Sequence, residues 1–160
     1  MTIFAPADVR LVQRDVLLRT GVDLSPEFEH ALWPTAERPK EKLVTGGVQA
    51  GKSYEGAAEV YIELPVIDLN REEPYRYWYI MPSYQTPKTE IEYLLEWCRS
   101  FYGNETVQDH LPEGGAALLD IFNGRVFVET RTSREPEAIA ARALDGAIVC
   151  EAGQQPVAVR

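Results

Sequence analysis

The 160-residue chain has little of several things that would mark a protein class. Its two cysteines, Cys98 and Cys150, and its two histidines, His30 and His110, follow no spacing typical of a zinc site or a disulfide framework. No apolar run is long enough to cross a bilayer, and the first ten residues lack the basic and apolar stretches of a secretion signal. We therefore expect an intracellular protein with free thiols, no zinc cluster and no membrane partner.

Positive charge is also scarce. Lysine and arginine number 16 against 25 acids, which gives a net charge of −9 and a pI near 4.8. Contacts to nucleic-acid phosphates need lysine and arginine in quantity, so we expect most of any DNA interface to lie outside this chain. The apolar fraction of 45% is ordinary for a globular protein of this length.

What the chain does have is the phosphate-loop pattern G-x-x-x-x-G-K-[ST]. The residues of the candidate site are Gly46, Gly47, Val48, Gln49, Ala50, Gly51, Lys52 and Ser53, followed by Tyr54. Glycines let backbone N–H groups converge on phosphates, and the positive end of the following helix adds to the same field. In this pattern the lysine contacts the β- and γ-phosphates and the hydroxyl ligates Mg²⁺. The motif predicts that the chain binds a nucleotide such as ATP with Mg²⁺.

The residues around the motif have the order that a phosphate loop requires. Leu43–Thr45 is a short β-favouring run before the loop, and residues 54–64 have helix-forming composition up to Pro65. We expect a helical lead-in over residues 1–40 and a P-loop core over residues 41–160. Further predicted elements are helices at 6–20, 25–32, 86–102 and 135–142, strands at 75–81 and 147–150, and a hairpin of strands 117–122 and 125–130 around Asn123-Gly124.

The aromatic run at 75–81 is predicted to pack in the core as a buried strand rather than to stack on bases. It ends in Met-Pro-Ser-Tyr-Gln at 81–85, and later come Thr132-Ser133 and the acidic strand end Gly-Ala-Ile-Val-Cys-Glu-Ala at 146–152. With the phosphate loop and the Asn-Gly hairpin, this order resembles the ATPase domain of a viral large terminase, the tailed-bacteriophage family that packages DNA into capsids. The resemblance covers most of residues 25–154.

The resemblance implies an α/β fold of three layers, the P-loop NTPase fold, with a mostly parallel sheet and an antiparallel hairpin at 118–130. It implies ATP hydrolysis with Lys52 stabilising the transferring phosphoryl group, Ser53 on Mg²⁺ and Glu151 placing the attacking water. Cys150 stands where the family has an Asp that holds Mg²⁺ through water, which predicts weaker metal affinity and slow hydrolysis. Arg142 lies near the place of the family's arginine finger, with Arg131 and Arg134 as weaker candidates.

Other family features differ or are missing. Val48 and Gln49 occupy the loop where many members carry an arginine, and Trp33 or Tyr54 is the candidate to pack on the adenine base. The family's remaining sheet, coupling motif and nuclease domain are not in this sequence, so we expect a truncated product or a fragment. The resemblance implies double-stranded DNA, a portal protein and a terminase small subunit as partners, mostly through other regions, a homo-oligomeric ring, and action in the host cytoplasm.

Three other functions fit the phosphate loop. A helicase-like ATPase would share the same nucleotide chemistry, and a nucleotide kinase would need an arginine-bearing lid that the sequence does not display. A non-catalytic, nucleotide-dependent assembly module is suggested by Cys150. Phosphate release without an acceptor would exclude the kinase, and its dependence on Glu151 would separate an ATPase from an assembly module.

Overall fold

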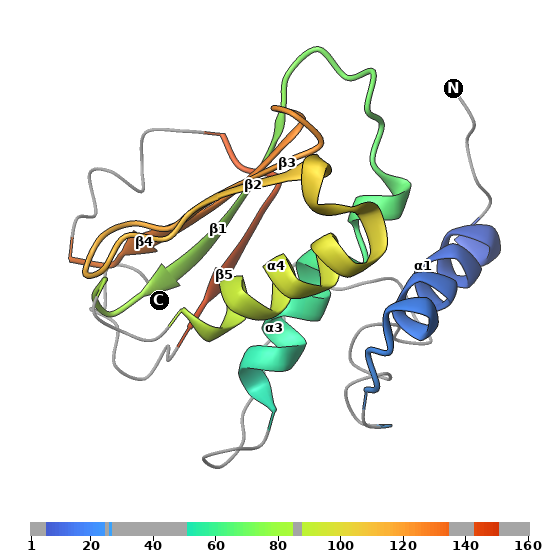
Figure 1. Ribbon diagram of the computed structural model, residues 1–160, viewed down its shortest axis with the longest axis horizontal. Helices are drawn as coiled ribbons and strands as arrows, with labels where there is room; N and C mark the ends of the chain where they lie inside the picture. Colours follow the sequence, from blue (N-terminus) through green and yellow to red (C-terminus); the bar gives the residue numbers. More distant parts are fainter. Residues whose placement is uncertain (1–5, 25, 27–50, 85–87, 135–142, 151–160) are drawn as a thin grey trace. The chain divides into compact units, whose positions relative to one another are not determined.

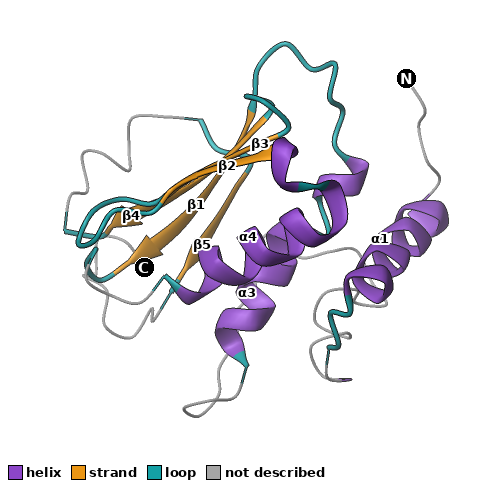
Figure 2. Ribbon diagram, in the orientation of Figure 1, coloured by secondary structure: helices purple, strands orange, loops and turns teal. Residues whose placement is uncertain are grey.

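The structure is a computed structural model that describes residues 6–24, 26, 51–84, 88–134 and 143–150. The chain separates into two compact units, Met1–Asp68 and Leu69–Arg160, and each is described by itself. Figures 1 and 2 show the elements of both units along the sequence and by type. The predicted strand at 43–45, the helices at 25–32 and 135–142, and the predicted boundary near residue 40 lie outside the described residues.

The first unit contains helix α1 (Pro6–Thr20), helix α3 (Lys52–Tyr61) and the short 3-10 helix η1 (Leu64–Val66). α1 matches its predicted span and stops at Gly21, which has a φ of 74°. In the last turn of α1 the Thr20 hydroxyl donates to the Val16 carbonyl at 2.8 Å and lies 2.5 Å from the hydroxyl of Tyr61. The hydrogen bond between the Thr20 and Tyr61 hydroxyls joins the C-terminal ends of α1 and α3.

α3 ends earlier than the sequence predicts. Its last residue is Tyr61, and Pro65 lies inside η1 rather than directly after the helix. The Glu63 N–H donates to the Val60 carbonyl at 3.1 Å, a tighter pattern than the α-helical one. Proline has no N–H and disfavours α-helical dihedrals in the residue before it, so the chain tightens before it reaches Pro65.

The second unit is built on one sheet. Its elements are β1 (Tyr75–Met81), α4 (Thr89–Tyr102), the 3-10 helix η2 (Asn104–Thr106), β2 (Val107–His110), β3 (Leu118–Ile121), β4 (Val126–Thr132) and β5 (Gly146–Val149). The strand order is β2-β3-β4-β1-β5. β1 is parallel to both β4 and β5, whereas β2, β3 and β4 form an antiparallel meander. The predicted mixed sheet with a parallel core is confirmed.

β1 lies between two parallel neighbours, and its last five residues, Tyr77 to Met81, are all buried. A strand buried on both faces reads as a continuous apolar run, which explains why the aromatic segment packs in the core as predicted. Helix α4 covers one face of the sheet (Figure 2), with Ile91, Leu94 and Cys98 among its buried residues. Side chains alternate along a strand, so Tyr79 faces α4 and its neighbour Trp78 faces the other way.

The hairpin forms around Asn123-Gly124 as predicted, but its turn is wider. Ile121 pairs with Val126, which leaves residues 122–125 in the turn rather than two residues. Phe122, Asn123 and Gly124 all have positive φ, at 59°, 52° and 86°. The Gly124 N–H donates to the Asp120 carboxylate at 2.5 Å, a side-chain bond that holds the longer turn.

In the second unit, the start of one helix differs from its predicted position, and one strand was not predicted. α4 begins at Thr89 with Lys88 as its N-cap, and the predicted start at Thr86-Pro87 falls at residues that the structure does not describe. β2 was not predicted, because in Val107–His110 only Val107 is buried and the other three residues are polar and exposed. A strand at the edge of a sheet needs no apolar alternation to be held by its neighbour.

Candidate functional site

The described part of the phosphate loop is the junction of the loop with α3. Gly51 precedes the helix in the left-handed conformation, with φ 78° and ψ 11°, and its carbonyl accepts from the Glu55 N–H at 3.0 Å. No side chain makes a capping hydrogen bond at this helix start. Lys52 is exposed and Ser53 is half-buried. Gly46, Gly47, Val48, Gln49 and Ala50 lie outside the described residues.

This helix start has the features that a phosphate site needs. A side chain at Gly51 would be strained by the positive φ, and the glycine at the N-cap brings no side chain of its own to the helix start. The positive end of the helix and the Lys52 ammonium favour an anion at the same place. The described residues therefore fit the phosphate group of a nucleotide. The Ser53 hydroxyl is a hard oxygen ligand and fits Mg²⁺.

Tyr54, a candidate for packing on adenine, has its hydroxyl 3.2 Å from the Asp23 backbone N–H, which donates to it. The ring is therefore tethered to the segment after α1 within the first unit. Trp33, the other candidate, lies outside the described residues, as do Glu151 and Arg142. Of the site residues and weaker candidates that the sequence predicts, the structure thus describes Gly51, Lys52, Ser53, Tyr54, Arg131 and Arg134, together with Cys150.

The acidic strand end lies in the second unit. β5 finishes at Val149, and the Cys150 N–H donates to the Ile80 carbonyl at 2.9 Å, so the pairing with β1 continues one residue further. Tyr79 pairs with Ile148, and Cys150 is two residues beyond Ile148. Since side chains two residues apart share a face, Cys150 belongs to the sheet face that α4 covers. Its side chain is half-buried, and its thiol takes part in no disulfide.

Tyr79 is the centre of a group of ionisable side chains on that face. Complete burial raises the pKa of its phenol well above the ordinary value, and the negative charges that Cys150, Glu90 and Cys98 carry when ionised push the pKa in the same direction. Burial also raises the pKa of the Cys98 thiol, so Cys98 stays protonated. The sequence analysis assigned no role to Glu90 or Tyr79.

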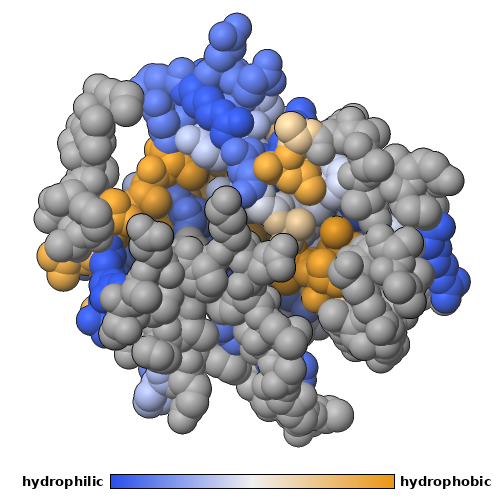
Figure 3. Space-filling model, turned by 180° about the vertical axis from the view of Figure 1, so that it is seen from behind, coloured by the Kyte–Doolittle hydropathy of each residue, from blue (hydrophilic) through white to orange (hydrophobic). Residues whose placement is uncertain are grey.

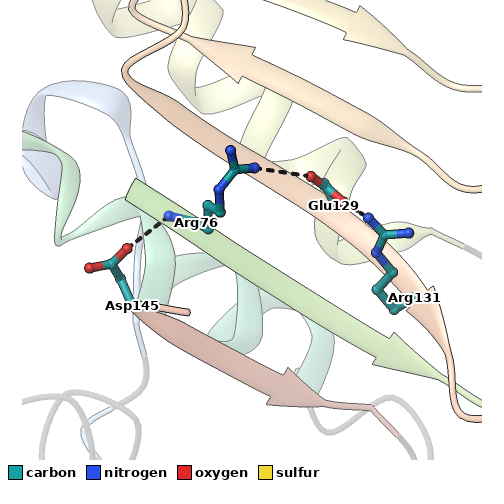
Figure 4. Close-up of polar contacts among 4 residues, drawn as sticks. All are labelled: Arg76, Glu129, Arg131 and Asp145. Atoms are coloured by element: carbon teal, nitrogen blue, oxygen red, sulfur yellow. Dashed lines mark hydrogen bonds and ion pairs between the residues drawn. The ribbon is translucent and has the colours of Figure 1, made fainter. Parts of the chain in front are cut away.

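The opposite sheet face carries a charged cluster, shown in Figure 4. Glu129 of β4 makes ion pairs with Arg131 on the same strand and, at 3.7 Å, with Arg76 of β1. The Arg131 guanidinium lies 5.2 Å from the centre of the Trp78 ring, and the Arg76 guanidinium lies 5.2 Å from that of Phe127. These contacts hold the Arg131 guanidinium against the sheet, whereas Arg134 in the turn after β4 is exposed.

Asp145 fixes the start of β5 to the start of β1. Its carboxylate accepts from the Arg76 backbone N–H at 2.9 Å (Figure 4) and from the Arg71 guanidinium at 2.5 Å. This hydrogen bond raises the pKa of Arg71. Residues 70–73, Asn-Arg-Glu-Glu, are exposed, and Figure 3 shows a hydrophilic surface at the top of its view. Asp145 therefore ties a polar surface loop to the sheet.

Two further properties bear on the kind of site. Within the described residues, no three or more histidine, cysteine, aspartate or glutamate side chains are grouped so that they could hold a metal ion. No helix among the described residues is long and apolar enough to span a membrane.

Comparison with known proteins identifies the fold. The sequence matches no protein-family model and no curated protein sequence. The solved ATPase domain of the large terminase of Thermus phage P74-26 superposes with a TM-score of 0.63 and 19% identity, covering 89% of this chain and 59% of that one. A mutant of the same domain gives a TM-score of 0.46 and 22% identity, covering 71% of this chain and 48% of that one.

The first of these matches extends over nearly all of this chain, although the chain spans only 59% of the length of the domain that it matches. At such low sequence identity the likeness concerns the fold. The mixed sheet with parallel strands β4, β1 and β5 thus has the α/β architecture of a phage large terminase ATPase domain.

Proposed function

We propose that this chain binds and hydrolyses ATP as part of a viral DNA-packaging motor of the large-terminase type. The observation that carries the proposal is the phosphate-loop sequence at residues 46–53, whose last glycine has a positive φ directly before the uncapped start of α3. The fold likeness to a terminase ATPase domain supports the same conclusion. A phosphate loop on this fold favours ATP hydrolysis over the other nucleotide-binding functions.

Each residue has a distinct task in this proposal. Backbone N–H groups of residues 46–51 and of the first turn of α3 hold the phosphates, and Lys52 places a positive charge where negative charge develops. Ser53 contributes its hydroxyl to Mg²⁺, which when bound neutralises charge on the phosphate oxygens. Glu151 orients the attacking water, and Arg142 reaches the γ-phosphate held by a neighbouring copy of the chain.

Cys150 sets the expected rate. A thiol is a soft and mostly protonated ligand, whereas Mg²⁺ prefers hard oxygen atoms. With Cys150 in place of an aspartate, we propose that nucleotide binding is well developed and that hydrolysis is slow. This residue also favours the second candidate function, a nucleotide-dependent assembly module without catalysis.

Nucleotide binding is tested by titrating a fluorescent ATP analogue into the purified chain and its Lys52→Ala variant. Hydrogen bonds to charged groups contribute about 1.5–3 kcal/mol, so the variant should bind about 10- to 100-fold more weakly. Lys88→Ala is the charge-matched control, because the Lys88 ammonium donates to the Pro112 carbonyl in the second unit. If Lys52→Ala and Lys88→Ala both bind like the parent chain, the phosphate loop is not the nucleotide site.

Hydrolysis is tested by phosphate release from ATP without any added acceptor. Release that depends on Glu151 supports an ATPase and argues against a nucleotide kinase, because a kinase needs an acceptor for the phosphoryl group. If the chain binds the analogue but Glu151→Ala leaves phosphate release unchanged, the assembly-module function replaces the hydrolytic one.

The wider setting follows from the terminase resemblance. We propose that the motor assembles as a homo-oligomeric ring in the host cytoplasm and engages double-stranded DNA, a portal protein and a terminase small subunit. With a net charge of −9 on this chain, we expect most DNA contacts to lie in other regions or subunits. Mixing Arg142→Ala chains with Glu151→Ala chains tests the ring, since each variant supplies what the other lacks. Activity restored on mixing supports an arginine acting between subunits.

A further inference from the structure

The sheet face away from α4 carries more positive charge than its paired acid neutralises. The side chains of Arg76 and Arg131 are 28% and 24% exposed there, and among the described residues Glu129 is the one carboxylate that pairs with either guanidinium (Figure 4). The Nε of Arg131 is buried and has no hydrogen-bond acceptor in this part of the chain. Because two guanidinium groups share one carboxylate, a positive charge and a buried donor remain for a further acceptor.

The same face exposes apolar surface next to the arginines. Ala147 and Val149 of β5 pair with Trp78 and Ile80 of β1, so these side chains share one face of the sheet. Both β5 residues are exposed, Val149 at 36%. Within the described part of the second unit, the one helix longer than a single turn is α4, which covers the other face. Arginine beside apolar side chains is typical of protein–protein interfaces. This surface, the arginine face, consists of Arg76, Arg131, Ala147 and Val149.

Helix α4 carries the opposite charge on its exposed side. Glu92 and Glu96 lie one helical turn apart, and both are exposed. Neither carboxylate makes an ion pair with any residue that the structure describes. Like charges four residues apart destabilise a helix, so a cation from outside the helix would be favourable here.

The spacing of the two surfaces also agrees. The β-carbons of residues four apart in a helix are about 5–6 Å from one another. Arg76 and Arg131 both contact the carboxylate of Glu129, so their guanidinium groups lie near each other on the arginine face. Two neighbouring arginines can therefore meet two neighbouring glutamates.

We propose that the arginine face docks on the exposed side of α4, at Glu92 and Glu96, in a second copy of the chain. The net charge of −9 favours an acidic protein surface over DNA as the partner, because acids elsewhere on the chain repel phosphates. The two docking surfaces differ, so the contact repeats from copy to copy and forms a ring where the rotation closes. This inference rests on the ring in the proposed function and is independent of the nucleotide chemistry.

Self-association is measured by analytical ultracentrifugation of the purified chain over a range of concentrations. Close charge pairs across an interface change affinity about 10-fold or more, so Glu92→Lys with Glu96→Lys should weaken self-association by at least that factor. Both residues are exposed, so the fold should be kept. Glu105→Lys with Glu113→Lys is the charge-matched control, because these residues are exposed in the same unit but lie outside α4. The control should associate like the parent chain.

A charge exchange tests the pairing itself. Arg76→Glu with Arg131→Glu should also weaken self-association. Mixed with the Glu92→Lys, Glu96→Lys chain, it should form complexes again, because every arginine-face position then meets an α4 of opposite charge. Circular dichroism checks that each variant is folded, and the lysine variant should bind an ATP analogue like the parent chain.

Three results would overturn the inference. Parent-like association of the lysine variant, or no recovery when two folded variants are mixed, removes this docking surface and leaves the ring standing. Loss of duplex DNA binding with unchanged self-association in Arg76→Glu with Arg131→Glu would assign the arginine face to DNA. A parent chain that stays monomeric while it binds the ATP analogue overturns the ring and this inference together, but not nucleotide binding.

Discussion

Replacing Gly51 by alanine tests the phosphate loop at the point where the structure describes it. The residue has φ 78° and ψ 11°, within the left-handed region. A residue with a Cβ is less stable there by roughly 1–2 kcal/mol, because the Cβ crowds the following carbonyl oxygen. If the bound loop needs this conformation, the same free energy appears as a loss of nucleotide affinity of about 5- to 30-fold.

The assay is titration of an ATP analogue, with chemical unfolding of the same samples. Gly124→Ala is the matched control, because Gly124 also has a positive φ, 86°, and an added Cβ meets no atom within 4 Å. Both variants should lose similar stability, but Gly124 is in the hairpin turn and its variant should bind the analogue normally. The reasoning is refuted if Gly51→Ala keeps the parent affinity, or if Gly124→Ala loses as much affinity as Gly51→Ala.

The two remaining predictions concern stability. Asp145→Ala should lower the free energy of unfolding by about 1 kcal/mol, because it removes the acceptor of the Arg76 backbone N–H. Arg71→Ala should have little effect, since it removes only solvent-exposed contacts, one with Asp145 and one with the Tyr75 ring; urea unfolding that ranks Arg71→Ala as the more damaging change would contradict this. Burial raises the pKa of Cys98, so the folded chain keeps a proton that the unfolded chain releases above about pH 8.5. Stability should be full below that pH and fall as the pH rises, by up to about 1.4 kcal/mol per pH unit. Cys98→Ala should flatten the fall between pH 8.5 and 10, and an unchanged slope would show that Cys98 is not responsible.

Much of the second unit could be predicted from local patterns. β1 matches its predicted bounds because Pro74 and Pro82 flank a dense apolar run, and the hairpin follows from Asn123-Gly124 between two β-favouring segments. β2 escaped prediction because a polar edge strand has almost no sequence signal. The width of the hairpin turn depended on the Asp120 side chain, which accepts from the Gly124 N–H.

The candidate site also has a part that the sequence predicts and a part that only the fold reveals. A phosphate loop is a contiguous segment whose chemistry depends on residue types at fixed spacing, so residues 46–53 and the expected nucleotide were read directly from the sequence. The same spacing assigned Cys150 to the place of an acid. Nothing in the sequence related Glu90 to Cys150, because the two lie 60 positions apart.

The sequence by itself determined the phosphate-loop motif, most strand and helix positions and the acidic strand end, because each depends on neighbouring residues. Only the tertiary structure decided that β1 lies between β4 and β5 and which side chains share a sheet face. Side chains alternate along a strand, so strand order and register together place Tyr79 and Cys150 beneath α4 with Glu90, and Arg76, Glu129 and Arg131 on the opposite face. That register joins residues far apart in the chain, and local sequence patterns carry no record of it.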